Sequence, residues 1–490
     1  MQLPIARRWL LVLCCIPLIA TVAHRLGPGP RPADPRPPAR IASTAAQPAQ
    51  QAYSLPPEKL AKAVSRSRIN LALNILGSLW GLAFLWILLA SRWAARLAAW
   101  TERLLRRRWM QGLLFFAFFL VISTLAGLPL DVIGHIVSRH YAISVQSWAG
   151  WLGDAAKSLG LLLLFGAPVM LLFNWIVRVS PRRYWIWVWL VSLPLIVLST
   201  FAAPLFDPIF NKFEPLLQTH PVLVARLETV VARTGTRIAP DRMFLMKASA
   251  KSNGLDAYVT GIGATKRFVI WDTATDRLPD DEVLFIFGHE SGHYVLNHIP
   301  KELAGSAAGS FFVFWACAGF AGWLARRYGV RWQLDPLNES TPPNTPVILS
   351  EAQRSRRTCG TFFAMGSNQD INEDNADLAP LASRQGFLVL LFALSAASII
   401  LQPVSNAFSR HFEHEADIYG QEAIHGLVAD PQKTAVSAFN HLGEAWLSDP
   451  NPSPFVEFWE YSHPSVQHRA SFAQHYNPWA NGGHGRFFMH

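Results

Sequence analysis

Six runs of the sequence, each 18 residues or longer, contain no Asp, Glu, Lys or Arg. Each run is long enough to cross a hydrocarbon core of about 30 Å as an α-helix. The composition agrees, because only 16% of the residues are charged, whereas soluble proteins have about 25%. The runs are 69–90, 112–130, 159–177, 184–203, 303–325 and 386–403. A small soluble domain is therefore excluded, and the sequence predicts a polytopic membrane protein.

The N-terminal region has a different composition. Residues 9–23 form a shorter apolar run behind two arginines, and no small-x-small cleavage site follows, which favours a membrane helix over a removed signal peptide. We therefore expect residues 1–23 to be a membrane segment or signal anchor, which brings the predicted spans to about seven. Nine prolines between residues 24 and 57 favour an extended linker, because this composition cannot bury a core.

Charged and turn-forming residues separate the later spans. Short β-type runs at 242–249, 257–263 and 267–273 precede a helical pattern over 280–298, so this region is expected to form a small α+β domain outside the lipid. The predicted fold class is mainly α, a membrane helix bundle with this domain attached. The predicted divisions are membrane helices over 58–203, the α+β domain over 204–302, a membrane helix over 303–325, a polar loop over 326–385, a membrane helix over 386–403, and a C-terminal soluble segment over 404–490.

An H-E-x-x-H motif, His289-Glu290-Ser291-Gly292-His293, lies within the predicted helix of the α+β domain. Positions i and i+4 share one helix face, so both imidazoles can reach one metal ion, and Glu290 can act as a base toward a water on that ion. A catalytic zinc site has three protein ligands and an open position. The motif therefore predicts one Zn²⁺ per chain and a third ligand elsewhere.

Glu413 is the candidate for the third ligand. It lies four residues before Asp417 in a predicted helix that directly follows the last apolar run. A carboxylate would complete a His₂Glu site, and Asp417, one turn further, could bond the free N–H of a ligand imidazole. The alternative for this segment alone is a solvated helix with mixed charge, but its pairing with the first motif favours a ligand.

With these motifs the chain resembles the integral-membrane zinc metallopeptidases of the CAAX prenyl protease type 1 family. The resemblance extends in order from about residue 58 to residue 475. The segments that carry it are Ala203-Pro204-Leu205-Phe206-Asp207, Asp256-Ala257-Tyr258, the H-E-x-x-H motif, S-R-x-F-E-x-x-A-D over 409–417, and Ser462-His463-Pro464 with Arg469.

The resemblance implies roles for individual residues. His289, His293 and Glu413 would be the zinc ligands. Glu290 would be the base, and His463 would donate a hydrogen bond to the tetrahedral intermediate. Contacts with the ligands or the substrate are implied for Asp417, Asp256, Tyr258 and Arg469. The family's seven-helix bundle encloses a large chamber within the membrane that contains the metal.

The chain also departs from the family. Asp256 stands where the family usually has asparagine, and an aspartate can donate a hydrogen bond only when it is protonated. In the family the zinc side faces the cytoplasm, whereas the arginines of the short loops favour the outer side for residues 204–302. Both orientations stay open.

Other features have weaker implications. The strand at 257–263 precedes the zinc helix and could pair with an extended peptide at a sheet edge. His298, five residues after His293, is expected to lie off the ligand face as a structural or solvated residue. The tail with His484 and His490 is rich in glycine and is expected to be disordered.

The sequence therefore predicts a membrane-embedded zinc metalloendopeptidase similar to CAAX prenyl proteases, with a peptide or protein substrate, lipidated or not, and with lipid as its surroundings. The net charge of +10 does not indicate nucleic acid, because much of the arginine flanks apolar runs. One alternative is a quality-control protease with the same mechanism. The other is a transporter or channel with a structural metal, which would normally have four protein ligands. The oligomeric state is left open.

Overall fold

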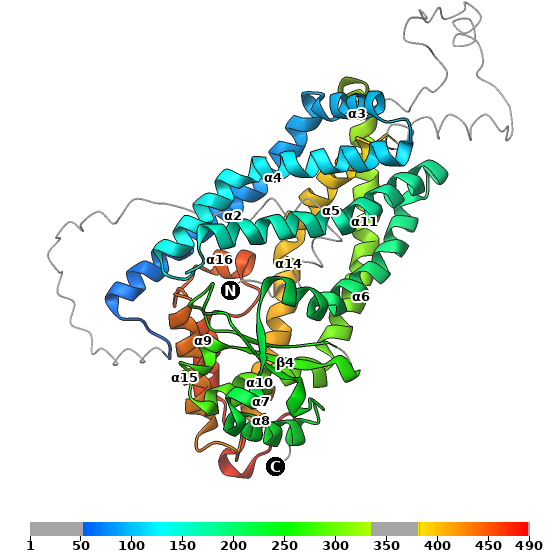
Figure 1. The fold of residues 1–490 in the computed structure, drawn as a ribbon. Helices are drawn as coiled ribbons and strands as arrows, with labels where there is room; N and C mark the ends of the chain where they lie inside the picture. Colours follow the sequence, from blue (N-terminus) through cyan, green and yellow to red (C-terminus); the bar gives the residue numbers. More distant parts are fainter. Residues whose placement is uncertain (1–51, 262, 335–380, 382, 489–490) are drawn as a thin grey trace, which may run out of the picture.

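The computed structural model describes residues 52–261, 263–334, 381 and 383–488. The molecule is elongated, with long helices at one end and a small sheet surrounded by shorter helices at the other (Figure 1). The predicted segment 1–23, nearly all of the predicted linker and most of the predicted polar loop lie outside the described residues.

Six of the predicted spans lie in helices of the structure. Five helices among the described residues are long and apolar enough to cross a membrane: α2 (Pro57–Ala90), α4 (Arg108–His140), α5 (Trp148–Val179), α11 (His298–Trp332) and α14 (Gly386–Ala423). A sixth, α6 (Tyr184–Phe210), contains a shorter apolar stretch over Tyr184–Leu198. Large side chains such as Leu164, Phe312 and Trp315 are exposed on these helices, as expected for surfaces that face lipid.

Several helices extend beyond the apolar runs that predicted them. The prediction of a loop from residue 326 is wrong for 326–332, because α11 continues to Trp332. The connection between the first two long helices contains a further helix, α3 (Trp93–Leu104). The last span and the predicted third-ligand helix are one uninterrupted element, α14. Apolar length marks the part of a helix that lipid can surround, whereas the helix itself continues as long as its backbone hydrogen bonds do.

A four-stranded sheet forms the base of the protease end. Its order is β1-β2-β4-β3, with β2 parallel to β4 and the other pairs antiparallel. The three predicted strands are present in shortened form, and β1 was not predicted. The strands are β1 (Phe213–Pro215), β2 (Met243–Met246), β3 (Ala257–Thr260) and β4 (Arg267–Trp271). The strand β3 therefore lies at an edge of the sheet.

The helix α10 (Asp280–Val295) lies against this sheet and is enclosed by helices on its other sides. Phe287 of α10 packs edge-on against Phe268 of β4, with ring centroids 4.8 Å apart. Residues 283–287 are all buried, so this part of α10 has apolar side chains around its whole circumference. The surrounding helices are α8 (Pro221–Thr234), α14 and α15 (Pro431–Ala445).

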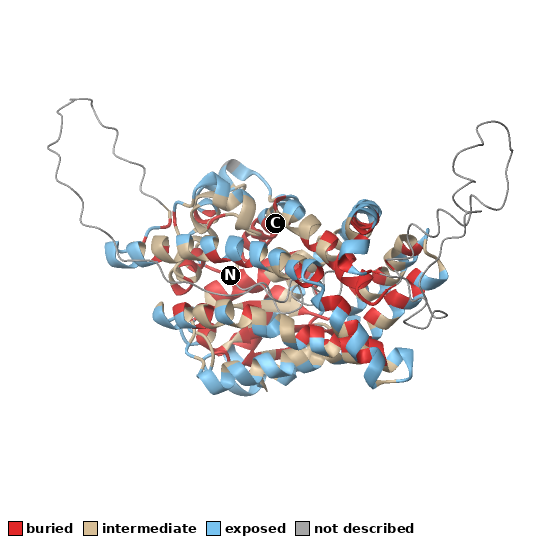
Figure 2. Cartoon of the chain, turned by 90° about the horizontal axis from the view of Figure 1, so that it is seen from above, coloured by how far each residue is buried: buried red, intermediate tan, exposed pale blue. Residues whose placement is uncertain are grey.

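Two hydrophobic clusters, one at each end of the molecule, share the helix α14. Leu388 of α14 belongs to the cluster among the membrane helices, and Tyr419 and Ala423 belong to the cluster around α10. Figure 2 shows buried residues in the interior of the helical layers and exposed residues along their outer faces. An apolar hollow between α5, α6, α11 and α14 is lined by side chains such as Phe173 and Leu391, and none of the expected zinc ligands lines it.

The C-terminal segment continues through α16 (Pro454–Glu460) and α17 (Val466–His475) into an ordered tail. The prediction of a disordered tail is wrong for the described residues up to Phe488. The carboxylate of Glu422 accepts hydrogen bonds from the backbone N–H groups of Arg486, Phe487 and Phe488. Glycine-rich composition did not reveal this contact, because its acceptor lies 64 residues earlier in the chain.

Candidate active site

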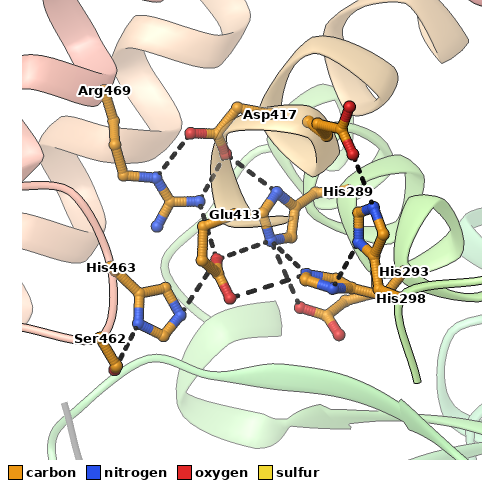
Figure 3. Close-up of polar contacts among 10 residues, drawn as sticks. His289, His293, His298, Glu413, Asp417, Ser462, His463 and Arg469 are labelled. Atoms are coloured by element: carbon orange, nitrogen blue, oxygen red, sulfur yellow. Dashed lines mark hydrogen bonds and ion pairs between the residues drawn. The ribbon is translucent and has the colours of Figure 1, made fainter. Parts of the chain in front are cut away.

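Three side chains from two helices meet at the centre of the protease end (Figure 3). His289 and His293 come from α10 and Glu413 comes from α14, and their ligand atoms all lie within 4.8 Å of one another. The two Nε2 atoms are 3.3 Å apart. Carboxylate oxygens of Glu413 lie 3.4 Å from His289 Nε2 and 3.7 Å from His293 Nε2. Among the described residues, these three form the one group of at least three His, Cys, Asp or Glu side chains that could hold a metal ion.

Glycines allow the two helices to approach closely enough for this meeting. A Cβ atom built on Gly288 would lie 3.2 Å from the Cα of Gly420, and one built on Gly420 would lie 2.8 Å from the backbone N of His289. Gly292 lies one turn along the same face of α10, against Tyr419. Small residues at a helix crossing remove the side chains that would hold the backbones apart. The local sequence thus brings Glu413 within reach of a helix that is more than 100 residues earlier.

The protonation of the two imidazoles is asymmetric. Burial disfavours a charged His289, but hydrogen bonds and charge interactions with Asp417 and Glu413 outweigh it and raise the pKa to about 10. Burial lowers the pKa of His293 to about 3, so that ring is neutral. Two nitrogens and a carboxylate that converge in a desolvated site form a donor set suited to a divalent cation. The residues present therefore fit a metal ion.

Glu290 lies beside this group and against the edge strand. Its nearer carboxylate oxygen is 4.0 Å from His289 Nε2, and the backbone of Val259 on β3 hydrogen-bonds to its carboxylate. Burial raises the pKa of Glu290 to about 7, with a further contribution from the negative charges of Glu413 and Asp256. A carboxylate with this pKa can exchange a proton near neutral pH.

Asp417 and Arg469 support His289 from behind. Asp417 Oδ1 lies 2.9 Å from His289 Nδ1, and Arg469 donates from Nε to Asp417 Oδ2 over 2.9 Å. A second Arg469 nitrogen is 2.5 Å from Asp417 Oδ1. If a metal ion took the place of the Nε2 proton, Nδ1 would keep its proton toward Asp417 and the lone pair of His289 Nε2 would face the centre.

His463 reaches the centre from the loop before α17. Its Nε2 lies 3.1 Å from Oε2 of Glu413, while its Nδ1 contacts the hydroxyl of Ser462 over 3.0 Å. The structure therefore places His463 next to the proposed third ligand and within the same small group of side chains.

The two residues expected on the strand have different surroundings. Tyr258 donates to Asp207 over 3.1 Å, and Asp207 pairs with the buried Arg267, so Tyr258 lies in a separate polar cluster. Asp256 is close enough to Glu290 for the two charges to interact. Burial raises the pKa of Asp256 to about 7, so a substantial fraction of this carboxyl is protonated at neutral pH and can donate a hydrogen bond as asparagine would.

Sequence reasoning missed the position of His298. His298 is not in the group of possible ligands, but the expectation of a structural or solvated residue did not include its contact with His293, whose Nδ1 is 3.2 Å from Nδ1 of His298. That prediction assumed one continuous helix, but the chain turns at Asn297, which has φ +56°, and α11 begins at His298. Asparagine tolerates this left-handed conformation, and Pro300 would lack the N–H that a continued helix requires. Asn297 and Pro300 were therefore the signals in the sequence that the helix ends there.

Comparisons with known proteins agree with this architecture. Residues 39–212 match the family model of the CAAX prenyl protease N-terminal region with five membrane helices, and residues 235–477 match peptidase family M48. The uncharacterized metalloprotease YhfN of Bacillus subtilis is 32% identical over 440 residues, covering 89% of this chain and 90% of that protein. CAAX prenyl protease 1 of Saccharomyces cerevisiae is 26% identical, covering 73% of this chain and 71% of its own.

A solved structure shows the same fold. The crystal structure of Ste24p from S. mikatae aligns with a TM-score of 0.65 and 22% identity, over 86% of this chain and 90% of that one. Sequence coverage of this extent, together with the long apolar helices and the convergent His and Glu side chains, leads to one conclusion. The chain is an integral membrane metalloprotease that belongs to peptidase family M48, in the CAAX prenyl protease type 1 family.

Proposed function

We propose that this protease is a zinc endopeptidase in which His289, His293 and Glu413 hold the ion. The supporting observation is the spacing of the donors. Two atoms bound at about 2.0–2.1 Å in a tetrahedral arrangement are about 3.3–3.4 Å apart. The pair of Nε2 atoms is separated by 3.3 Å, and one carboxylate oxygen lies 3.4 Å from His289 Nε2. When bound, zinc supplies Lewis-acid polarisation that lowers the pKa of water from about 16 to about 7.

Glu290 is the proposed general base. Its carboxylate takes a proton from the attacking water and returns it to the nitrogen of the departing amine, a function suited to a pKa of about 7. Asp417 holds the Nδ1 proton of His289, which keeps the ring oriented during the reaction. His463 is the proposed donor to the oxygen that becomes negative in the tetrahedral intermediate, because its Nε2 already faces the centre at Glu413.

The edge strand β3 is the proposed site of substrate backbone binding. Among the described residues, β4 is the one strand that pairs with β3, so the outer backbone groups of β3 can accept an extended peptide. Glu290 contacts the backbone of Val259 on the same strand, which places the base next to a peptide bound there. Backbone recognition selects little among side chains, so we propose that substrate choice depends on a lipid group, with prenylated peptides as the substrate class.

The test of the chemistry uses Glu290→Gln and Glu413→Ala in purified protein. Glu290→Gln should keep about one zinc per chain and lose peptide hydrolysis by about 10²–10⁴-fold, because it removes only the base. Glu413→Ala should lose zinc, because it removes a ligand. Glu228→Gln, an exposed position on α8, is the matched control and should behave as wild type. Hydrolysis by Glu290→Gln at the wild-type rate would contradict the assignment.

The test of the substrate class compares one peptide with and without a prenyl group. A higher kcat/KM for the prenylated form would support the proposed substrate class. Equal values for the two forms would contradict it and would support a broader quality-control role with the same chemistry.

A further inference from the structure

His293 has a hydrogen-bonding partner that the family motifs did not indicate. The Nδ1 of His298 lies 3.2 Å from Nδ1 of His293, on the side opposite to Glu413 (Figure 3). His298 is fully buried and stacks on Phe412, with ring centroids 4.7 Å apart and an interplanar angle of 27°. Its ring is therefore held in one orientation, with one nitrogen toward the ligand and the other pointing away.

Behind His298 the contacts continue to the surface. The Nε2 of His298 lies 3.3 Å from Oε2 of Glu415, and Arg486 donates to Oε1 of Glu415 over 2.6 Å. Glu415 is 13% exposed and Arg486 is 52% exposed. The row formed by His293, His298, Glu415 and Arg486 therefore passes from the buried centre to solvent. This arrangement parallels the support of His289, where Asp417 and then Arg469 follow the imidazole. Each candidate ligand histidine thus has a carboxylate and an arginine behind it.

The C-terminal tail is anchored independently of this contact. Glu422, which is fully buried, accepts from three consecutive backbone N–H groups beginning at Arg486, and Tyr476 also donates to it. The rings of Phe487 and Phe488 contact Tyr419. Because the backbone is already held, only the side chain of Arg486 has to be ordered when it pairs with Glu415. The family model ends at residue 477, before these tail contacts.

The contacts of this row are compatible with a neutral His293 that binds a metal through Nε2. If Nε2 of His293 offers a lone pair to a metal, its Nδ1 carries the proton and donates to Nδ1 of His298. His298 must then carry its own proton on Nε2 and donate to Glu415. Arg486 holds the carboxylate of Glu415 in place as the final acceptor. In this arrangement the row holds the proton of His293 on Nδ1 and leaves the lone pair of Nε2 directed toward the centre.

We infer that His298, Glu415 and Arg486 position the ligand His293, so that the docked C-terminal tail is a working part of the metal centre. The inference rests on the proposed zinc function. His298, Glu415 and Arg486 are positioning residues, because they act through His293 and do not touch the reacting atoms. Outer partners of ligand histidines typically contribute about 10–100-fold to metal affinity.

The test measures the zinc dissociation constant by competition with a chromogenic chelator, on the purified full-length protein in detergent. His298→Phe keeps a ring against Phe412 but removes the acceptor, and should weaken zinc binding by about 10–100-fold. Arg486→Met removes the terminal charge at a half-exposed site and should weaken binding by about 3–10-fold. Arg486→Lys, which can still form the single contact, should restore binding to within about twofold of wild type.

Further variants separate positioning from general stability. Lys433→Met removes an exposed cation whose ion-pair partner among the described residues is the nearby Asp430, and serves as the matched charge control. Glu422→Gln weakens the anchor of the tail and should reproduce the loss seen with Arg486→Met. The melting temperature of metal-free Arg486→Met should equal that of Lys433→Met, since a purely structural role would lower it.

The outcomes distinguish the two proposals. If wild type binds zinc and neither Arg486→Met nor Glu422→Gln changes the zinc dissociation constant, this inference is overturned and the zinc assignment stays intact. Failure of wild type to bind zinc overturns the proposed function and the inference with it. Weakened binding by Arg486→Met with rescue by Arg486→Lys supports the inference.

Discussion

Gly420→Ala tests whether close helix packing builds the metal centre. The added Cβ would lie 2.8 Å from the backbone N of His289 and 3.0 Å from its Cα, whereas ordinary contact begins at 3.4 Å. The neighbour is backbone, which cannot rotate away as a side chain can. The helices α10 and α14 must therefore separate by about 0.6 Å at this point, and overpacking of this kind costs about 1–3 kcal/mol of stability.

The same shift has a larger consequence for the site. Metal-ligand distances tolerate about ±0.2 Å, and a displacement of about 1 Å can lower catalysis by about 10²-fold. His289 lies at the contact and Glu413 lies on the opposing helix, so their separation changes directly. We expect kcat/KM to fall by about 10–100-fold, with weaker zinc binding and a lower melting temperature.

The assay is peptide hydrolysis with zinc affinity and thermal melting measured on the same samples. Gly309→Ala on α11 is the matched control, since a Cβ there meets nothing within 4 Å. It should leave activity unchanged and stabilise the helix slightly, by about 0.5–1 kcal/mol. The reasoning is refuted if Gly420→Ala matches Gly309→Ala in activity, zinc affinity and melting temperature.

Three further predictions concern groups around the centre. Asp417→Asn should weaken zinc binding by about 10–100-fold, because an amide holds the Nδ1 proton of His289 less firmly; an unchanged zinc dissociation constant would refute this role. Asp256→Asn should raise kcat/KM relative to wild type above pH 7. Burial raises the pKa of Asp256 to about 7, so its carboxyl is a donor below that pH and loses its proton as pH rises. An amide donates throughout this range. Equal pH profiles from pH 6 to about pH 9 for the two proteins would show that no donor is needed there. Asp207→Ala should destabilise the protein by about 3–5 kcal/mol, because it leaves Arg267 buried without its carboxylate; a melting temperature equal to that of wild type would contradict this.

The predicted fold was most accurate where the physical signal is local. Uncharged runs long enough to span a bilayer identified every long membrane helix among the described residues, because burial in lipid depends on the composition of one segment. Helix ends were predicted less well, as α11 shows, since backbone hydrogen bonding continues past the apolar residues. The strand β1 was missed because three residues that pair with β2 carry no alternating pattern of their own.

The candidate site divides in the same way. The residues His289, Glu290 and His293 could be recognised from spacing alone, since one helical turn places them together. Glu413 could be named only as a candidate, because its approach to α10 depends on glycines of two helices meeting at one crossing. The contact between His298 and His293 was not predicted, because a turn at Asn297 redirects the chain and brings the ring of His298 back to His293.

The sequence by itself determined that this chain crosses a membrane and carries a helix with two histidines and a glutamate on one face, because hydropathy and helical periodicity are properties of contiguous residues. Tertiary structure alone decided which distant groups complete the centre. Glu413 and His463 reach it from positions more than 100 residues after His289, through helix packing, and a docked tail brings Arg486 to Glu415. Such contacts depend on the relative placement of whole elements, which no local pattern of residues encodes.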